Sequence, residues 1–253
     1  MYSYDFPLSP KARTYLKFEN IFKRSDFQVS DKNHDLNAEP YVMYILRAIV
    51  DYIDLCDGSS SIKIELLKDL ERCHARLNEW IKNPESDSEA IESLIAQIKS
   101  ARNSLDGFTR QRTVLKDDNL LESVKQRFFS PSGVNCFDTP MFEFWMHLPI
   151  EERENTILKW LRELDCLRIP VLTVLYLWRL CAEYQNRVAT CGFMQENADT
   201  CDIINIQYAK DIRGYPVVSG FQSRINVRFL PFDKGATVGD IDFKIAYIKS
   251  SLQ

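Results

Sequence analysis

The residues of this chain that could carry out chemistry are three histidines, seven cysteines and one strand-like stretch with two arginines. The histidines, His34, His74 and His147, do not form a metal-binding pair of the type H-x-x-x-H. The cysteines are scattered without a C-x-x-C spacing, so we expect free thiols in a reducing compartment. Neither a nucleophile elbow nor a glycine-rich phosphate loop occurs. The sequence therefore predicts a protein that is not an enzyme and that uses no cofactor and no metal ion.

The stretch from Gly220 to Pro231 is the strongest candidate for a binding surface. Side chains of a β-strand point alternately to opposite faces. The alternation places Ile225, Val227 and Phe229 on one face, and Arg224, Asn226 and Arg228 on the other. Guanidinium groups held on a rigid strand match the geometry of carboxylates. The pattern by itself fits two interpretations, a site for an anionic partner or a solvated outer strand face.

Length and composition narrow the class of protein. With 253 residues, 45% of them hydrophobic and 12% aromatic, the chain can form one large domain or two small ones around a well-filled core. The net charge of −4 disfavours general nucleic-acid binding, which usually shows a basic domain. We expect no membrane insertion and no signal peptide, since no apolar run reaches the length of a membrane span and the N-terminus lacks a basic and apolar leader.

Periodic apolar residues predict helices over most of the chain before residue 188. Expected helices run from Pro10 to about 23, Pro40 to about 57, 62–82, 86–107 and 117–129, then from Pro140, from Pro149, and from Pro170 to about 184, with a polar loop over 25–39. Ser86 and Glu89 have the spacing of a capping box. The segment after Pro170 is apolar nearly all round, which indicates either a central core helix or a subunit interface.

Period-2 patterns predict strands at the two ends of the chain. Tyr2, Tyr4 and Phe6 alternate with polar residues, and residues 190–248 form an antiparallel sheet that this N-terminal strand must join. The expected fold class is α+β, with a mainly α-helical bundle domain and a smaller antiparallel β-sheet domain. We expect the helical domain over 9–188 and the β-domain over 189–253, joined by the strand 1–8.

A second basic region lies between Phe108 and Phe129. There Lys125 and Arg127 would lie on the solvent side of the predicted helix 117–129, and Lys116 just before it. This pattern fits a contribution to an anion-binding surface, and it equally fits an ordinary solvated helix face.

Several segments, taken together and in order, resemble the ZapD family of bacterial proteins that associate with FtsZ in cell division. They cover essentially the whole chain and include Ser223–Pro231, Ile64–Arg72, Phe137–Pro140, Trp145–Pro149, Val124–Phe128, Phe6–Leu8 and Ala12–Lys17. The resemblance implies a cytoplasmic homodimer recruited to the mid-cell division ring. Such a dimer would bind the C-terminal tail of FtsZ and would cross-link and bundle FtsZ filaments.

The resemblance also implies which residues bind the tail. Arg224 and Arg228 match the arginines that the family contributes from its signature strand, and Ser223 and Asn226 lie beside them. Further contacts are implied for Lys17, Lys116, Asn119, Lys125 and Arg127. Lys17 and Asn119 depart from the arginines that relatives can carry there, and lysine is a weaker bidentate donor. The alternative function is a cytosolic small-anion-binding enzyme or domain that uses the Arg224 and Arg228 face.

Overall fold

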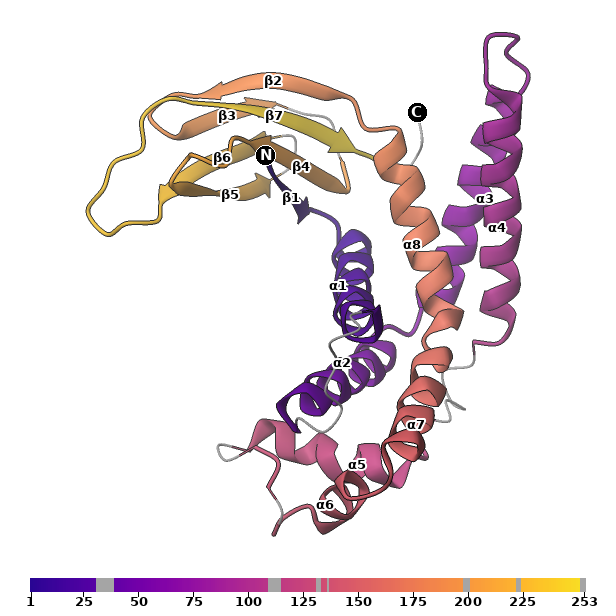
Figure 1. Cartoon of the computed structure of the whole chain (residues 1–253). Helices are drawn as coiled ribbons and strands as arrows, with labels where there is room; N and C mark the ends of the chain where they lie inside the picture. Colours follow the sequence, from indigo (N-terminus) through magenta and orange to yellow (C-terminus); the bar gives the residue numbers. More distant parts are fainter. Residues whose placement is uncertain are drawn as a thin grey trace. The chain divides into compact units, whose positions relative to one another are not determined.

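The structure is a computed structural model that describes residues 1–30, 39–108, 115–130, 133–135, 137–197, 201–221 and 224–250. Its fold class is α+β, as the sequence predicted (Figure 1). The helical elements are α1 (Pro10–Ser30), α2 (Glu39–Gly58), α3 (Ile62–Trp80), α4 (Ser88–Asp106), α5 (Asn119–Lys125), the 3₁₀ turn η1 (Gln126–Phe129), α6 (Pro140–Met146), α7 (Ile150–Glu163) and α8 (Asp165–Leu180). The strands are β1 (Tyr2–Pro7), β2 (Tyr184–Ala189), β3 (Phe193–Asn197), β4 (Ile203–Tyr208), β5 (Gly214–Phe221), β6 (Arg224–Pro231) and β7 (Ile241–Ile248).

The chain divides into two compact units, which we call the β-unit (residues 1–16 and 174–253) and the helical unit (residues 17–173). In the β-unit the described strands form two antiparallel sheets, ordered β1-β4-β7-β2 and β3-β6-β5. The predicted pairing of the N-terminal strand is confirmed, since β1 lies against β4 with Tyr2 opposite Tyr208. The sequence predicted a single sheet. Two form because β3 pairs with β6 rather than with the strands of the first sheet.

The core of the β-unit lies between the two sheets. Phe229 of β6 packs edge-on against Tyr208 of β4 and Phe243 of β7, with ring centroids 5.3 and 5.4 Å apart. Ile225 and Val227, on the same side of β6, are buried with it. This inward set is the apolar half of the alternation in β6, so the sequence pattern alone predicted which face of the strand is buried.

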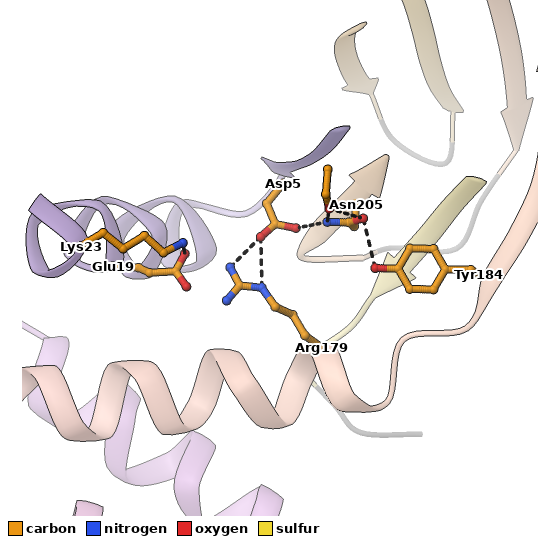
Figure 2. A network of polar contacts seen from close by, with 7 residues as sticks. Asp5, Glu19, Lys23, Arg179, Tyr184 and Asn205 are labelled. Carbon is orange, nitrogen blue, oxygen red and sulfur yellow. Dashed lines mark hydrogen bonds and ion pairs between the residues drawn. The ribbon is translucent and has the colours of Figure 1, made fainter. Parts of the chain in front are cut away.

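A polar network covers the opposite, outer face of the four-stranded sheet (Figure 2). Arg179, near the end of α8, donates to Asp5 Oδ2 of β1 through Nη2 at 2.6 Å and Nε at 3.1 Å. Asn205 of β4 donates to the other oxygen of Asp5 at 2.7 Å and accepts from the Tyr184 hydroxyl at 3.1 Å. Because one carboxylate receives donors from a helix and a neighbouring strand, this network fixes the end of α8 on the sheet.

Asp202 fastens the N-terminus of α1 to the end of β7. Its backbone carbonyl accepts from the amide of Leu8 at 2.8 Å, and its Oδ2 accepts from the amide of Ser250 at 2.7 Å. Burial by itself raises the pKa of Asp202, but hydrogen bonds from Ser9 and Ser250 outweigh it, so the net pKa lies below the ordinary value. The ionised carboxylate is therefore the form that stabilises the fold.

This pKa shift predicts a pH-dependent effect of Asp202→Asn. A carboxyl whose pKa is lowered on folding contributes stability above its unfolded pKa of about 4 and loses it as pH falls through the lower folded value. The wild type should exceed the variant in unfolding free energy at pH 7, and the difference should shrink at pH 3. Urea titrations at both pH values measure it. An equal difference at the two pH values would contradict the ionised role.

The helical unit contains two separate packing arrangements. One is the antiparallel pair α3 and α4, which lie side by side in Figure 1. In the other, α5 contacts α2 and α6, and Asp118 caps α5 by accepting from the amides of Leu120 and Leu121. The second oxygen of Asp118 accepts from Trp160 Nε1 of α7 at 2.8 Å. This single carboxylate therefore both begins α5 and joins it to α7.

Three sequence-based boundaries are wrong. Helix α1 continues through residues 25–30, which were expected to be loop. The hydroxyl of the buried Ser25 donates a hydrogen bond to the Phe22 carbonyl at 2.8 Å. Helix α8 begins at Asp165, and Pro170 lies inside it, whereas proline was read as the start. Asp87, rather than Ser86, caps α4 by accepting from Ala90. Strand β2 was missed.

No helix in the described ranges is long and apolar enough to cross a membrane.

Candidate functional site

The two arginines of the signature strand lie on the outer face of the three-stranded sheet. Arg224 and Arg228 are exposed, and Asn226 between them is half-buried. In this sheet β6 is the central strand, with β3 and β5 on its two sides. The positions of both arginines on a strand hydrogen-bonded on both sides are therefore well fixed. Ser223, which was predicted to belong to the site, lies outside the described residues.

The register of the sheet defines which side chains surround the arginines. We call this surface the arginine face; its outward positions are Phe193, Gln195 and Asn197 of β3, Arg224, Asn226 and Arg228 of β6, and Tyr215, Val217 and Ser219 of β5. None of these positions holds a carboxylate, although the chain as a whole carries a net charge of −4. The arginine face is thus a local region of positive charge on an acidic protein.

Neither arginine is neutralised by a neighbour. In the described part of the chain, Arg224 and Arg228 make no ion pair and no side-chain hydrogen bond, whereas Arg179, Arg187 and Arg213 of the same unit are all paired with carboxylates. The one acidic residue of β3, Glu196, points between the sheets, where Arg187 Nε donates to it at 2.9 Å and Tyr247 also donates. Both guanidinium groups of the arginine face therefore remain available to an external anion.

The spacing of the arginines determines what kind of anion fits. They lie four residues apart on one strand, so their Cα atoms are about 13 Å from each other at the usual rise per residue. One carboxylate or phosphate meets both forks only if the two long side chains bend toward each other, whereas two separated groups meet them as they extend from the sheet. The face therefore suits an extended ligand with two separated negative groups better than a single small anion.

Sequence reasoning did not identify the apolar neighbours of Arg228. Phe193 of β3 and Val217 of β5 are its direct register partners, and they are 46% and 44% exposed. Tyr215, two residues before Val217, is 46% exposed. Each residue belongs to an alternating segment, so its outward direction was predictable. Its position beside Arg228 was not, because that depends on strand pairing.

The basic residues around α5 belong to the helical unit and are largely paired. Lys116 binds Asp57, Lys125 binds Asp54 at 2.8 Å, and Arg127 lies 3.8 Å from Asp138. The hydrogen bond that Lys125 donates to Asp54 raises the pKa of Lys125. Lys116 and Lys125 do line one cavity of about 260 Å³, together with Asp57, Glu122 and three apolar side chains. Because two carboxylates accompany the two lysines, this cavity has no net positive charge.

The two remaining predicted residues are solvent-exposed. Asn119 is the first residue of α5, next to its cap Asp118. Lys17 lies on α1 and has no ion pair within the described ranges. In the described structure, no side-chain contact joins Lys17 or Asn119 to another residue of the predicted tail-binding site.

Two of the thiols, Cys56 and Cys201, are made less acidic by burial. The Cys56 thiol is buried beside Tyr52, and burial raises its pKa to about 12. Burial also raises the pKa of Cys201 to about 11. Thiols with such values are protonated at neutral pH and are poor nucleophiles and metal ligands. The described residues contain no group of three or more histidine, cysteine, aspartate or glutamate side chains that could hold a metal ion.

Comparison with known proteins adds an independent line of evidence. Residues 16–228 match the sequence model of the family ZapD, described as a cell division protein. The chain is 32% identical to "Cell division protein ZapD" of Photobacterium profundum over 247 residues, 96% of this chain and 97% of that protein. It is 30% identical to the protein of the same name from Vibrio parahaemolyticus, over 97% of this chain and 98% of the relative. Both matches span the strands and the helices alike.

Proposed function

Since the chain belongs to the ZapD family of cell division proteins, we propose that its role in division is to bind the C-terminal tail of FtsZ. In this proposal, the tail binds to the arginine face, and a dimer of the protein cross-links FtsZ filaments and bundles them in the division ring. The protein acts in the cytoplasm and is recruited to mid-cell by this interaction. No catalytic step is involved.

One observation supports the binding surface above all others. Among the described residues, Arg224 and Arg228 have no ion-pair partner on a face that carries no carboxylate, whereas Arg179, Arg187 and Arg213 of the same unit are paired. A flexible peptide with acidic and apolar residues, which the family implies for the FtsZ tail, has complementary charge. Arginines on a central strand lose little freedom on binding, which lowers the entropic cost of the complex. Titration of a labelled tail peptide against the wild type and arginine variants tests the proposal.

Bundling follows from two binding surfaces in one particle. Each tail can bind with modest affinity, because a dimer that holds one filament meets a second tail at high effective concentration. Two arginine faces on one dimer would then hold two filaments together without any strong single contact. Loss of dimerisation should therefore abolish bundling while leaving the binding of one tail peptide unchanged.

We assign the self-association surface to the exposed apolar side chains around α6. Phe137, Met141 and Phe144 are 80%, 47% and 69% exposed, and contiguous exposed apolar groups mark protein interfaces. Helix α8, which the sequence indicated as a possible interface, is mostly buried. Its outward residues Ile169, Tyr176 and Leu180 are 39%, 51% and 50% exposed, less on average than the group around α6.

Phe144→Ser should therefore weaken the dimer. We expect the dimer dissociation constant to rise roughly tenfold or more, because aromatic anchors are typical hot spots of interfaces. Sedimentation equilibrium of the wild type, Phe144→Ser and Tyr176→Ser over a range of concentrations measures the change. A wild type that stays at its monomer mass of 29.5 kDa at micromolar concentration would overturn the dimer. An effect of Tyr176→Ser alone would move the interface to α8.

The remaining predicted residues have a smaller place in this proposal. Lys116, Lys125 and Arg127 are engaged by carboxylates of their own unit, so releasing them to a ligand carries an energetic cost. We expect Lys125→Ala to reduce tail affinity less than Arg228→Ala does. Lys17 and Asn119 remain candidates for separate contacts with the tail.

The small-anion alternative is disfavoured by the same geometry. An enzyme would need a base or a nucleophile beside the arginines, and the described outward positions of the arginine face hold no histidine, cysteine or carboxylate. A small anion would also have to draw together two side chains whose Cα atoms are about 13 Å apart, at a cost in side-chain freedom. Phosphate or citrate that competed with the tail peptide at micromolar concentration would restore this alternative.

A further inference from the structure

Arg228 stands in a row of three side chains that cross the sheet, with an apolar neighbour on each side. Phe193, Arg228 and Val217 are direct register partners in adjacent antiparallel strands, so their side chains share one face. Directly opposite residues in such sheets have Cβ atoms about 4.5 to 5.5 Å apart. The side chain of Arg228 therefore leaves the sheet between those of Phe193 and Val217.

Arg224 has a different environment. Across β3 its register partner is Asn197, and the row between the arginines consists of Gln195, Asn226 and Ser219. Asn226 Nδ2 lies 3.5 Å from the Ser219 hydroxyl, so this middle row is polar. The arginine face thus has an apolar end, made of Phe193, Tyr215 and Val217 around Arg228, and a polar row between the two arginines.

The exposed apolar end of the arginine face is a candidate surface for binding an apolar group of a ligand. Phe193, Tyr215 and Val217 are each nearly half exposed. Phe193 and Val217 lie on either side of Arg228, and Tyr215 is two residues before Val217 on the same strand. A hydrated apolar group gains free energy when it is covered, in proportion to the area removed from water. Covering this end would also remove water from around Arg228 and strengthen its interaction with a carboxylate.

We propose that the apolar end of the arginine face receives a large apolar side chain of the bound peptide, and that Phe193 and Val217 determine which acidic peptides bind. This inference rests on the proposed function and specifies its ligand. An extended chain advances about 3.3 Å per residue, so two carboxylates that reach Arg224 and Arg228 are about four residues apart. The ligand is therefore an extended acidic peptide with a large apolar residue next to the carboxylate bound by Arg228.

Conservative threonine variants test the proposal without removing strand propensity. Val217→Thr keeps the shape of the side chain but makes it polar, and Phe193→Thr replaces the ring with a β-branched residue that also favours strands. Val188→Thr is the matched control, because Val188 is an exposed strand valine, 50% exposed, in the other sheet. Thermal melts of all three variants should stay close to that of the wild type.

We expect Phe193→Thr and Val217→Thr each to raise the Kd for the FtsZ tail peptide about 4- to 10-fold, in line with the loss of a partly buried apolar contact. Val188→Thr should change it less than about twofold, as is usual for surface substitutions away from a site. The dependence of Kd on salt should remain that of the wild type, because no charge is removed. A peptide with serine in place of its large apolar residues should bind wild type more weakly, and the threonine variants should then add little.

The outcomes separate this inference from the proposed function. If Arg228→Ala weakens binding while both threonine variants bind like the wild type, the apolar contact is refuted and the proposed function stands. If arginine variants and threonine variants all bind the tail normally, the site itself is refuted. If the threonine variants weaken binding of the serine-substituted peptide as strongly as that of the natural one, their effect is indirect and the inference is overturned.

Discussion

The variant with both Arg224→Ala and Arg228→Ala is expected to lose measurable binding to the FtsZ tail peptide. Each arginine should contribute roughly 1.5 to 3 kcal/mol, the range for hydrogen bonds to charged groups. This corresponds to roughly a 10- to 150-fold increase in Kd for each single variant. The two effects should add, because the arginines lie about 13 Å apart on one strand and do not share a ligand carboxylate.

Three controls make this result interpretable. Thermal melts of the double variant should match those of the wild type, because Arg224 and Arg228 make no ion pair in the described structure and the inward side of β6 forms the core. Raising the salt concentration should weaken binding by the wild type, since exposed charges are screened over about 8 Å at physiological ionic strength. Lysine at both positions should recover binding only in part, because lysine restores the charge without the fork.

Unchanged tail affinity in a double alanine variant that melts normally would place the binding site elsewhere. The arginine face would then be an ordinary solvated strand surface. Arg187→Ala does not serve as a neutral control, because Arg187 connects β2 to Glu196 between the sheets. Lys244 of β7 is the better comparison, being an exposed basic residue on the other sheet with no ion pair among the described residues.

Local patterns were sufficient to predict most elements of the fold. The alternation in β6 predicted its buried face, because the apolar side chains of Ile225, Val227 and Phe229 all point to one side of the strand. Prolines at the start of α6 and before α7 were read correctly, since proline fits the first turn of a helix. The pairing of β1 with the C-terminal strands was predicted by elimination, because an isolated strand is not stable. The expected boundary between domains at residues 188 and 189 stays a prediction.

Features that depend on distant partners could not be predicted in this way. The polar end of α1 remains helical because Ser25 satisfies its hydroxyl within the helix and also accepts from Arg168 of α8 at 3.2 Å. Pro170 lies inside α8 and does not begin it, because the residues before it, back to Asp165, are also helical. Strand β2 was missed because its residues are mostly polar, and its place in the sheet comes from pairing with β7.

In the candidate site, too, features within one strand were predictable and features that depend on distant partners were not. Arg224 and Arg228 were found from a pattern within one strand. Their lack of carboxylate partners could not be read from the sequence, because it depends on which side of β3 holds Glu196. The ion pairs of Lys116 and Lys125 were equally hidden, since their carboxylate partners belong to α2, far away along the chain. Because of those ion pairs, β6 is a stronger candidate than α5 for the surface that binds the tail.

Phe229→Ala should cause the largest loss of stability among single changes in the β-unit. Phe229 is 3% exposed and lies between Tyr208 and Phe243, with both ring contacts edge-on. Truncating a buried phenylalanine to alanine typically costs about 3 to 5 kcal/mol, because it removes buried area and leaves a cavity. The aromatic pairs add to this cost beyond the buried area.

The neighbouring residue supplies the matched control for this change. Arg228 precedes Phe229 on the same strand but points to the opposite face, so Arg228→Ala should alter the unfolding free energy by less than about 0.5 kcal/mol. Phe229→Leu should fall between the two, because leucine fills part of the volume. Denaturant unfolding monitored by near-ultraviolet circular dichroism measures all three variants. A loss below about 1 kcal/mol for Phe229→Ala would mean that the two sheets are not held together by this aromatic cluster. The rigid outer surface of β6, on which tail binding depends, would then lack its support.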